Sequence, residues 1–216
     1  MTRPTAGDGN PYGRNVSELP PYAAVVLAGG RAARMGGQAK PQLDVGGRTI
    51  LEAVLAAVPD ASPRIVVGPP QPVPVDVLVV RENPPRGGPV AAMRAGLAHV
   101  PTEVVALLAG DLPFLTGALV RALRERLTGD GVLVVDDTDR DQLLLGVWRT
   151  AALRAAVAGV EGPTSVRRAL APLAVRRLHP EVGPGQPPPW THCDTPADLA
   201  RARAAAARRV PRRPRG

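Results

Sequence analysis

The sequence is poor in cysteine, in aromatic residues and in long apolar runs. Its 216 residues include one cysteine, Cys193, which excludes an internal disulfide framework and a cysteine-rich zinc site. Aromatic residues make up 2% of the chain, too few for a platform on which single-stranded nucleic acid could stack. No apolar run approaches the length of a transmembrane helix, and no export signal is recognisable. We therefore expect a cytoplasmic protein that has no membrane partner.

Basic charge is distributed unevenly along the chain. The formal net charge is +8 at pH 7, yet seven arginines and no acidic residue follow Ala200, so residues 1–200 hold 20 basic and 19 acidic groups. The body of the protein is therefore neutral, and its basic end suits only nonspecific attachment to polyanions. We expect no specific nucleic-acid partner. Of the 27 basic residues 26 are arginine, and the single lysine is Lys40.

Short apolar runs alternate with helical patterns between two irregular ends. The composition predicts a disordered leader over 1–20, one domain over 21–207 and a basic disordered tail over 208–216. Strands are predicted at 23–28, 64–67, 75–80, 103–109, 131–135, 143–147 and 173–178, and helices at 49–57, 88–100, 116–127, 150–157, 164–170 and from 195. This order is typical of a three-layer α/β/α fold with a mostly parallel Rossmann-like sheet. Such sheets bind ligands at the carboxyl ends of their strands.

A glycine-rich segment follows the first predicted strand. Residues 27–41 read Leu-Ala-Gly-Gly-Arg-Ala-Ala-Arg-Met-Gly-Gly-Gln-Ala-Lys-Pro. The glycines allow the backbone to approach a ligand and to direct amide hydrogens at it, while Arg34 and Lys40 add positive charge where a triphosphate would lie. The segment is not a Walker A loop, because Pro41 follows Lys40, and it lacks the pattern Gly-x-Gly-x-x-Gly. It predicts a phosphate-binding loop; a flexible surface loop is the alternative interpretation.

Two later segments also lie at predicted strand ends. Asp111 follows the buried strand at 103–109, where a carboxylate needs a cation and its hard oxygens suit Mg²⁺. A helix N-cap is the alternative role, but Thr116 is better placed for it. In the segment 81–93, Gly88 allows close approach of a flat base and Pro89 suits the first turn of a helix. A tight turn between a strand and a helix explains that segment equally well.

The pattern Leu-Ala-Gly-Gly-x3-Arg-Met-Gly-Gly-x2-Lys-Pro resembles the opening motif of the MobA-like nucleotidyltransferases, the family that includes molybdenum cofactor guanylyltransferase. The resemblance covers about residues 22–205 and implies a nucleotide-diphospho-sugar transferase-like fold. It also implies catalytic roles for Lys40, Arg34 and Asp111, with Asp111 binding an essential Mg²⁺. The nucleotide-binding residues that it implies are Leu27, Ala28, Gly29, Gly30, Arg34, Lys40, Gly68, Asn83, Gly87, Gly88 and Asp111.

The segment 190–196 resembles the closing strand and the final-helix start of the same family. In several relatives an Asp at the position of Asp194 supplies a second metal contact. Ordinary turn chemistry before Thr195 and Pro196 is the alternative reason for this residue.

The resemblance implies transfer of GMP from GTP to a molybdopterin-type phosphate acceptor with release of pyrophosphate, by a monomer or homodimer. The family's guanylyltransferases commonly have Asp where this chain has Asn83, and Asn where it has Gly68. Transfer of CMP or another nucleotide to a pterin, sugar phosphate or polyol phosphate therefore stays open. An inactive module that binds a nucleotide or cofactor is the alternative from another class, and the intact Lys40 and Asp111 argue against it.

The remaining polar residues give weaker signals. We expect His99 and His179 to be solvated and Cys193 to be a small core residue. His192 lies close to Asp194 in the sequence and could face the substrate. Four acidic residues fall where the family's acceptor-side segment lies, and a solvated acidic turn is the alternative: Asp136, Asp137, Asp139 and Asp141. Asp141 and Gln142 are the part of this run to test.

Overall fold

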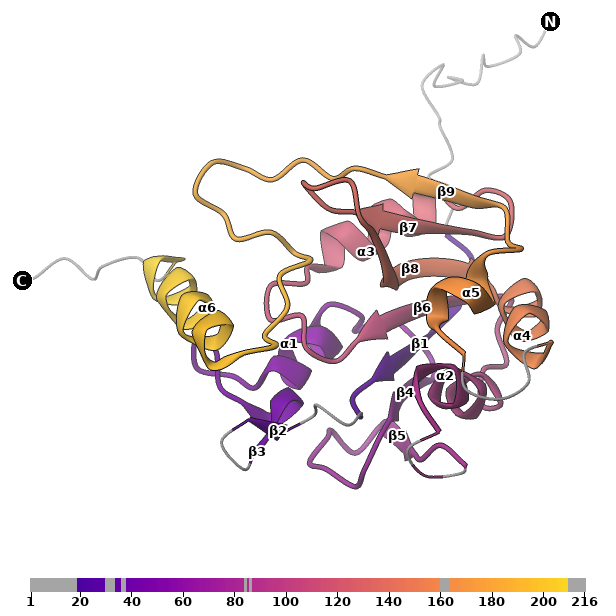
Figure 1. The fold of residues 1–216 in the computed structure, drawn as a ribbon, viewed down its shortest axis with the longest axis horizontal. Coiled ribbons are helices and arrows are strands. Elements are labelled where there is room, and N and C mark those ends of the chain that lie inside the picture. The colour runs from indigo at the N-terminus through magenta and orange to yellow at the C-terminus, as the bar shows by residue number, and fades with distance from the viewer. Residues whose placement is uncertain are drawn as a thin grey trace, which may run out of the picture.

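The computed structural model describes residues 19–29, 34, 35, 38–83, 85, 87–159 and 164–209, and within these ranges seven strands form one sheet in the order β5-β4-β1-β6-β8-β7-β9 (Figure 1). The strands are β1 (Tyr22–Leu27), β4 (Arg64–Val67), β5 (Val77–Val80), β6 (Val104–Ala109), β7 (Gly131–Val135), β8 (Asp141–Arg149) and β9 (Val175–Leu178). β8 runs antiparallel to both of its neighbours, and the other pairings are parallel. The expectation of a mostly parallel sheet is confirmed.

β1 and β6 form the centre of the sheet because each is an uninterrupted apolar run. All six residues of each strand are buried. Along β1, alternate side chains enter opposite cores: Tyr22, Ala24 and Val26 face one core, and Ala23, Val25 and Leu27 face the other. Burial on both faces is typical of parallel strands covered by helices. The sequence placed both strands within one residue of their observed bounds.

Helices cover both faces of the sheet and complete the expected three layers. α1 (Ile50–Ala56) and α3 (Gly117–Glu125) contribute to the first core, while α2 (Pro89–Leu97), α4 (Thr150–Ala158) and α5 (Val166–Leu170) contribute to the second. The predicted N-terminal signals are confirmed at α1, where Thr49 and Glu52 form a capping box, and at α3, where the Thr116 side chain accepts from Leu119 N. No helix in the described ranges is long and apolar enough to cross a membrane.

Helix α2 is fixed tightly against the sheet. A Cβ at Gly96 would lie 2.5 Å from Val25 Cγ1, so only glycine allows the observed approach. Arg154 of α4 donates to the carbonyls of Leu97 and Val100 at 2.7 and 2.6 Å, which caps the end of α2. These contacts hold the C-terminal end of α2 in place, and its first turn begins at Pro89. Gly88 precedes that turn with a φ of 88°, a conformation that favours glycine.

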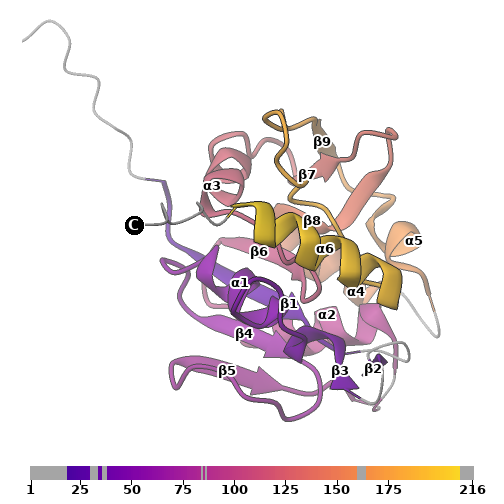
Figure 2. The same cartoon turned by 90° about the vertical axis from the view of Figure 1, so that its left-hand side faces the viewer.

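A third, smaller core joins the C-terminal helix α6 (Pro196–Arg209) to the segment after the glycine-rich loop. Leu199 and Ala202 of α6 pack with Leu43, Ile50 and Phe114. In Figure 1 the arrows of β1, β6, β7 and β9 point toward the side on which α6 lies, whereas the antiparallel β8 runs the other way. Figure 2 views the molecule from the side of α6. α6 therefore lies beyond the carboxyl ends of the strands, where the ligand site is expected.

The structure also differs from the sequence predictions. β8 begins at Asp141 instead of residue 143, because its polar first residues pair with β7. Residues 190–193, compared above with a closing strand, are irregular and form no strand. The glycine-rich region contains β2 (Arg34–Met35), β3 (Gln38–Ala39) and the 3₁₀ helix η1 (Lys40–Gln42). α6 continues to Arg209, and residues 1–18 and 210–216 lie outside the described ranges.

Candidate active site

Three strand ends meet at one edge of the sheet. Ala28 N donates to Val67 O at 2.8 Å, and Gly110 N donates to Leu27 O at 2.9 Å. These bonds extend the pairing of β1 with β4 and β6 beyond the last strand residues. The chain segments that begin at Ala28, Gly68 and Gly110 therefore leave the sheet side by side.

Small residues make this convergence possible. A Cβ at Gly68 would lie 2.8 Å from Ala28 O, and one at Gly110 would lie 3.0 Å from Ala28 Cα. Larger side chains would push the three strand ends apart, so packing against Ala28 accounts for glycine at both positions. Of the other predicted nucleotide contacts, Leu27 and Ala28 are buried and Gly29 is exposed. This edge presents mainly backbone to a ligand.

Lys40 and Asp194 lie together although 154 positions separate them in the sequence. Lys40 Nζ donates to Asp194 Oδ1 at 2.9 Å. The lysine side chain is 9% exposed and the aspartate side chain 65% exposed, so a largely buried cation points toward an open carboxylate. Lys40 begins η1 and Asp194 precedes α6, and the third core holds these two segments against each other.

Asp111 contacts His192, a residue that carries only a weak signal in the sequence. The distance from His192 Nδ1 to Asp111 Oδ1 is 2.9 Å. Burial acts to lower the pKa of His192, but the hydrogen bond and the charge of Asp111 outweigh it, so the pKa is raised above its ordinary value of 6.5. The charge of Asp194 also raises the pKa of His192, and the charge of Lys40 lowers it. The imidazole ring therefore interacts electrostatically with the Lys40–Asp194 pair as well as with Asp111.

A glutamine continues this contact into the sheet. His192 Nε2 lies 3.1 Å from Gln142 Oε1, and Gln142 Nε2 donates to Asp136 Oδ2 at 2.7 Å. The neighbouring Asp141 accepts instead from Arg177 at 2.8 Å and forms an ion pair with Arg167. The structure thus separates the two residues that the sequence grouped: Gln142 joins the site and Asp141 does not.

The carboxylates of Asp111 and Asp194 are the groups that could hold a metal ion. Among the described residues, each has one oxygen engaged, by His192 and Lys40 respectively, while its second oxygen accepts no hydrogen bond. The same residues contain no group of three or more histidine, cysteine or acidic side chains arranged for a metal. Two hard oxygen donors fit Mg²⁺, because this ion keeps several waters and binds substrate phosphates. They are too few for a metal site in which the protein supplies every ligand.

The other predicted residues divide into two groups. Asn83, Gly87 and Gly88 are exposed on the segment that leads from β5 to α2. Gly30 and the side chain of Arg34 lie outside what the structure describes, so their predicted roles stay predictions.

The expected solvation of His99 and His179 is confirmed, since both are exposed. Cys193 is fully buried, and burial raises the pKa of its thiol to about 11, which suits a core residue and not a nucleophile.

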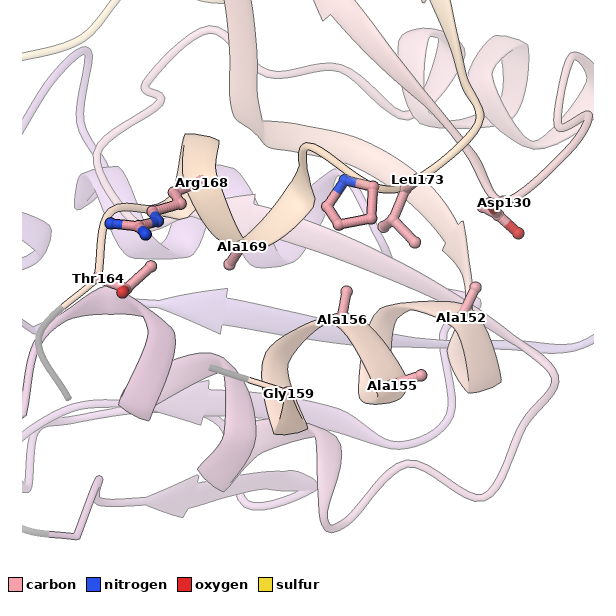
Figure 3. Close-up of a pocket in the computed structure, with 10 residues that line it drawn as sticks. Asp130, Ala152, Ala155, Ala156, Gly159, Thr164, Arg168, Ala169 and Leu173 are labelled. Carbon is pink, nitrogen blue, oxygen red and sulfur yellow. The ribbon is translucent and has the colours of Figure 1, made fainter. Parts of the chain in front are cut away.

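A hollow of about 770 Å³ lies elsewhere, between α4 and α5 (Figure 3). Alanines 152, 155, 156 and 169 form much of its lining, with Asp130 and Arg168 among its few charged residues. None of the predicted site residues borders it, and it lacks the converging polar groups of a catalytic site. We therefore place the candidate active site at the strand ends and not in this hollow.

Known proteins resemble this chain over most of its length. The family model for the MobA-like NTP transferase domain matches residues 24–180. A molybdenum cofactor guanylyltransferase from Nitrobacter hamburgensis is 31% identical over 203 residues, which cover 88% of this chain and 97% of that protein. The family match ends before His192 and Asp194, so the structure is what brings these two residues to the glycine-rich end of the sheet.

Solved structures share the fold. Molybdopterin-guanine dinucleotide biosynthesis protein A from Archaeoglobus fulgidus aligns with a TM-score of 0.64 at 17% identity, covering 87% of this chain and 99% of that one. A 2-C-methyl-D-erythritol 4-phosphate cytidylyltransferase from Thermus thermophilus aligns with a TM-score of 0.64 at 23% identity, covering 85% and 98%. These likenesses confirm the nucleotide-diphospho-sugar transferase fold. They do not discriminate between nucleotides.

Proposed function

The chain belongs to the MobA-like NTP transferase family, and from this premise we propose that it transfers GMP from GTP to the phosphate of a molybdopterin-type acceptor and releases pyrophosphate. One observation carries the proposal: the match to a molybdenum cofactor guanylyltransferase extends over 97% of that protein. We propose the cytoplasm as the compartment, because nucleoside triphosphates are available there.

Lys40 is the residue we propose for neutralising the triphosphate. Its ammonium is held at the sheet edge by a buried stem and is paired with one exposed carboxylate. A bound triphosphate would offer it more negative charge than Asp194 does, so we expect the ammonium to turn to the phosphates. Gly29, Gly30 and Arg34 would complete the cradle with backbone amides and a second cation.

Asp111 and Asp194 are the residues we propose for holding Mg²⁺. Each has an oxygen that the described residues leave available, and both are hard donors. The ion would neutralise charge on the α-phosphate and on the departing pyrophosphate.

The transfer itself requires little acid–base catalysis by the protein. An oxygen of the acceptor phosphate forms a bond to the α-phosphorus, and the bond from that phosphorus to the bridging oxygen of pyrophosphate breaks. No general base is needed, because the attacking phosphate is already ionised near neutral pH. Positioning and charge stabilisation therefore supply the rate enhancement, and Lys40, Arg34 and the loop amides provide them.

The base and ribose would lie along Gly68 and the segment with Asn83, Gly87 and Gly88. Gly68 is buried against Ala28 O and its N–H donates to Val80 O at 2.9 Å, so at this position the backbone carbonyl is the group that would face the base. GTP is the triphosphate we favour, on the strength of the guanylyltransferase relatives.

Purified protein with Mg²⁺ tests the proposal directly. We expect GTP to raise the melting temperature more than CTP, ATP or UTP, because a bound ligand stabilises in proportion to its occupancy. We also expect pyrophosphate release from GTP when molybdopterin is added. A larger shift in melting temperature and faster turnover with CTP would show that cytosine and not guanine is the preferred base. Absence of pyrophosphate release with every triphosphate and acceptor would refute the proposed nucleotidyltransferase activity.

A further inference from the structure

Four polar side chains form a continuous chain from Asp111 into the β7–β8 connection. His192 Nδ1 contacts Asp111 Oδ1 at 2.9 Å, and His192 Nε2 contacts Gln142 Oε1 at 3.1 Å. Gln142 Nε2 then donates to Asp136 Oδ2 at 2.7 Å. Asp111 follows β6, His192 precedes α6, Gln142 belongs to β8 and Asp136 follows β7. Four separate segments therefore meet through side chains alone.

Asp136 is a rigid anchor for this chain. Its Oδ1 accepts from Thr138 N at 2.8 Å, from Thr138 Oγ1 at 2.7 Å and from Arg140 N at 3.0 Å. Burial acts to raise the pKa of Asp136, but the hydrogen bonds from Arg140 and Thr138 outweigh it and lower the pKa to about 2. The group is therefore an ionised carboxylate that only accepts hydrogen bonds.

The anchor fixes the orientation of the Gln142 amide. Because Asp136 Oδ2 can only accept, the NH₂ group of Gln142 must face it, and the carbonyl Oε1 must face His192. His192 Nε2 consequently donates to Gln142, which fixes the plane of the imidazole ring. An ionised Asp111 can only accept, so the full set of hydrogen bonds is made when His192 Nδ1 also carries a proton and donates to Asp111 Oδ1.

We propose that Gln142 and Asp136 are positioning residues of the active site, which act through His192 to hold the Asp111 carboxylate in the orientation that binds the metal. The chain occupies Oδ1 and leaves Oδ2 for the cation and its phosphates. This assignment rests on the proposed function. It gives Asp136 in the β7–β8 connection and Gln142 in β8 a part in catalysis that they exert through His192.

The substitution Gln142→Met tests the assignment first. Methionine has nearly the same length but neither donates nor accepts well, so both hydrogen bonds of the amide are lost. Partners that orient a metal ligand typically contribute about 10- to 100-fold to metal affinity or activity. We expect the Mg²⁺ concentration for half-maximal turnover with GTP to rise by about this factor. Calorimetric titration with Mn²⁺ in the presence of GTP should show the same loss, while GTP binding without metal should stay unchanged.

A pair of matched variants separates positioning from mere packing. Gln142→Glu keeps the size but sets a carboxylate against Asp136, so the contact should break and metal affinity should fall. In the double variant Asp136→Asn/Gln142→Glu, the new amide at position 136 can donate to the new carboxylate at 142, which still accepts from His192 Nε2. Both hydrogen bonds of residue 142 are restored, the one to residue 136 with donor and acceptor exchanged, and we expect Mn²⁺ affinity to recover to within about threefold of the wild type.

The outcomes distinguish this assignment from the proposed function. Wild-type turnover with unchanged metal affinity in both single variants would overturn the positioning role alone. Loss in Gln142→Glu without recovery in the double variant would also overturn it, because packing and not hydrogen bonding would then be responsible. A wild type that binds neither metal nor GTP would overturn both proposals. Melting temperatures verify that each variant is folded.

Discussion

Both ends of the central sheet contain carboxylates paired with cationic side chains. The two ends differ in how many oxygens of each carboxylate accept a hydrogen bond from the protein. At the amino end, Asp60 accepts from Tyr22 Oη at 2.6 Å and from Arg124 Nη1 at 2.8 Å, one bond to each oxygen. At the carboxyl end, Asp111 and Asp194 each have one oxygen engaged by a described residue. The protein engages both oxygens of Asp60, which suits a structural role, whereas an oxygen that the described residues leave unengaged is available to a cation.

Burial of the cation does not explain this difference. The side chain of Arg124 is 10% exposed and that of Lys40 is 9% exposed. Arg124, however, also lies 3.9 Å from the centroid of the Tyr22 ring and donates to Pro20 O at 3.1 Å. Lys40 has a single ionic partner among the described residues. Substitutions at the amino end should therefore lower stability and leave turnover unchanged. Substitutions at the carboxyl end should lower turnover and leave stability nearly unchanged.

Asp111→Asn should have the largest effect. The amide is the same size, but it removes the negative charge that attracts the metal, so we expect kcat with GTP to fall by about 1000-fold or more. The free energy of unfolding should change by less than about 1 kcal/mol, because Asp111 is partly exposed and keeps its contact with His192. Steady-state kinetics and urea unfolding measure the two quantities. An active variant would reassign the metal site, and a strongly destabilised one would remove the contrast between the ends.

Lys40→Arg should have the second largest effect. Arginine keeps the charge but replaces a compact ammonium with a broad planar fork, which does not fit a site where the stem is buried. We expect kcat to fall by about 10- to 1000-fold. Pyrophosphate release under saturating GTP measures it. Wild-type turnover in this variant would mean that positive charge alone, and not its position, is required at residue 40.

The sequence predicted the parts of this molecule that depend on local patterns. β1 and β6 are continuous apolar runs, and Thr49 and Thr116 are ordinary helix caps, so these elements agree with expectation to within one or two residues. The glycine-rich segment likewise directed attention to the carboxyl end of β1. Each of these signals lies within a stretch of about fifteen residues.

The missed features depend on contacts between distant segments. His192 is 81 positions from Asp111 and 50 from Gln142, so no local spacing reveals their contacts. Its one sequence signal is its place two residues before Asp194. β8 was predicted too short because Asp141 and Gln142 look like loop residues, whereas one pairs with arginines and the other joins the site. Polar residues of the site thus look like loop residues in the sequence, although some of them belong to a strand of the sheet.

Arg124→Met tests the amino end. The substitution removes two hydrogen bonds and the contact with the Tyr22 ring, but water can reach Asp60, whose side chain is 61% exposed. We expect the free energy of unfolding to fall by about 1–3 kcal/mol, with kcat unchanged.

Arg121→Met is the matched control for that variant. It lies on the same helix and removes an exposed ion pair with Glu125, so it should cost no more than about 0.5 kcal/mol. Equal losses in the two variants would show that helix α3 and not the Asp60 network determines the effect. Loss of turnover in Arg124→Met would contradict the structural role of the amino end.

Apart from the control Arg121→Met, Tyr22→Phe should have the smallest effect, and it should have the most specific pH dependence. It removes one hydrogen bond to Asp60, so the free energy of unfolding at pH 7 should fall by about 0.5–1.5 kcal/mol. Burial first, and then the hydrogen bond and charge of Asp60, raise the pKa of Tyr22 above its ordinary value of 10.0. Because the unfolded tyrosine loses its proton first, the stability that this shift provides is complete below pH 10 and is lost as the pH rises above it. Phenylalanine has no such proton, so the difference in stability between wild type and variant should shrink in urea titrations between pH 9 and 11, while Cys193, present in both, cancels. A constant difference across this range would mean that neither burial nor Asp60 raises the pKa of this tyrosine in the folded protein.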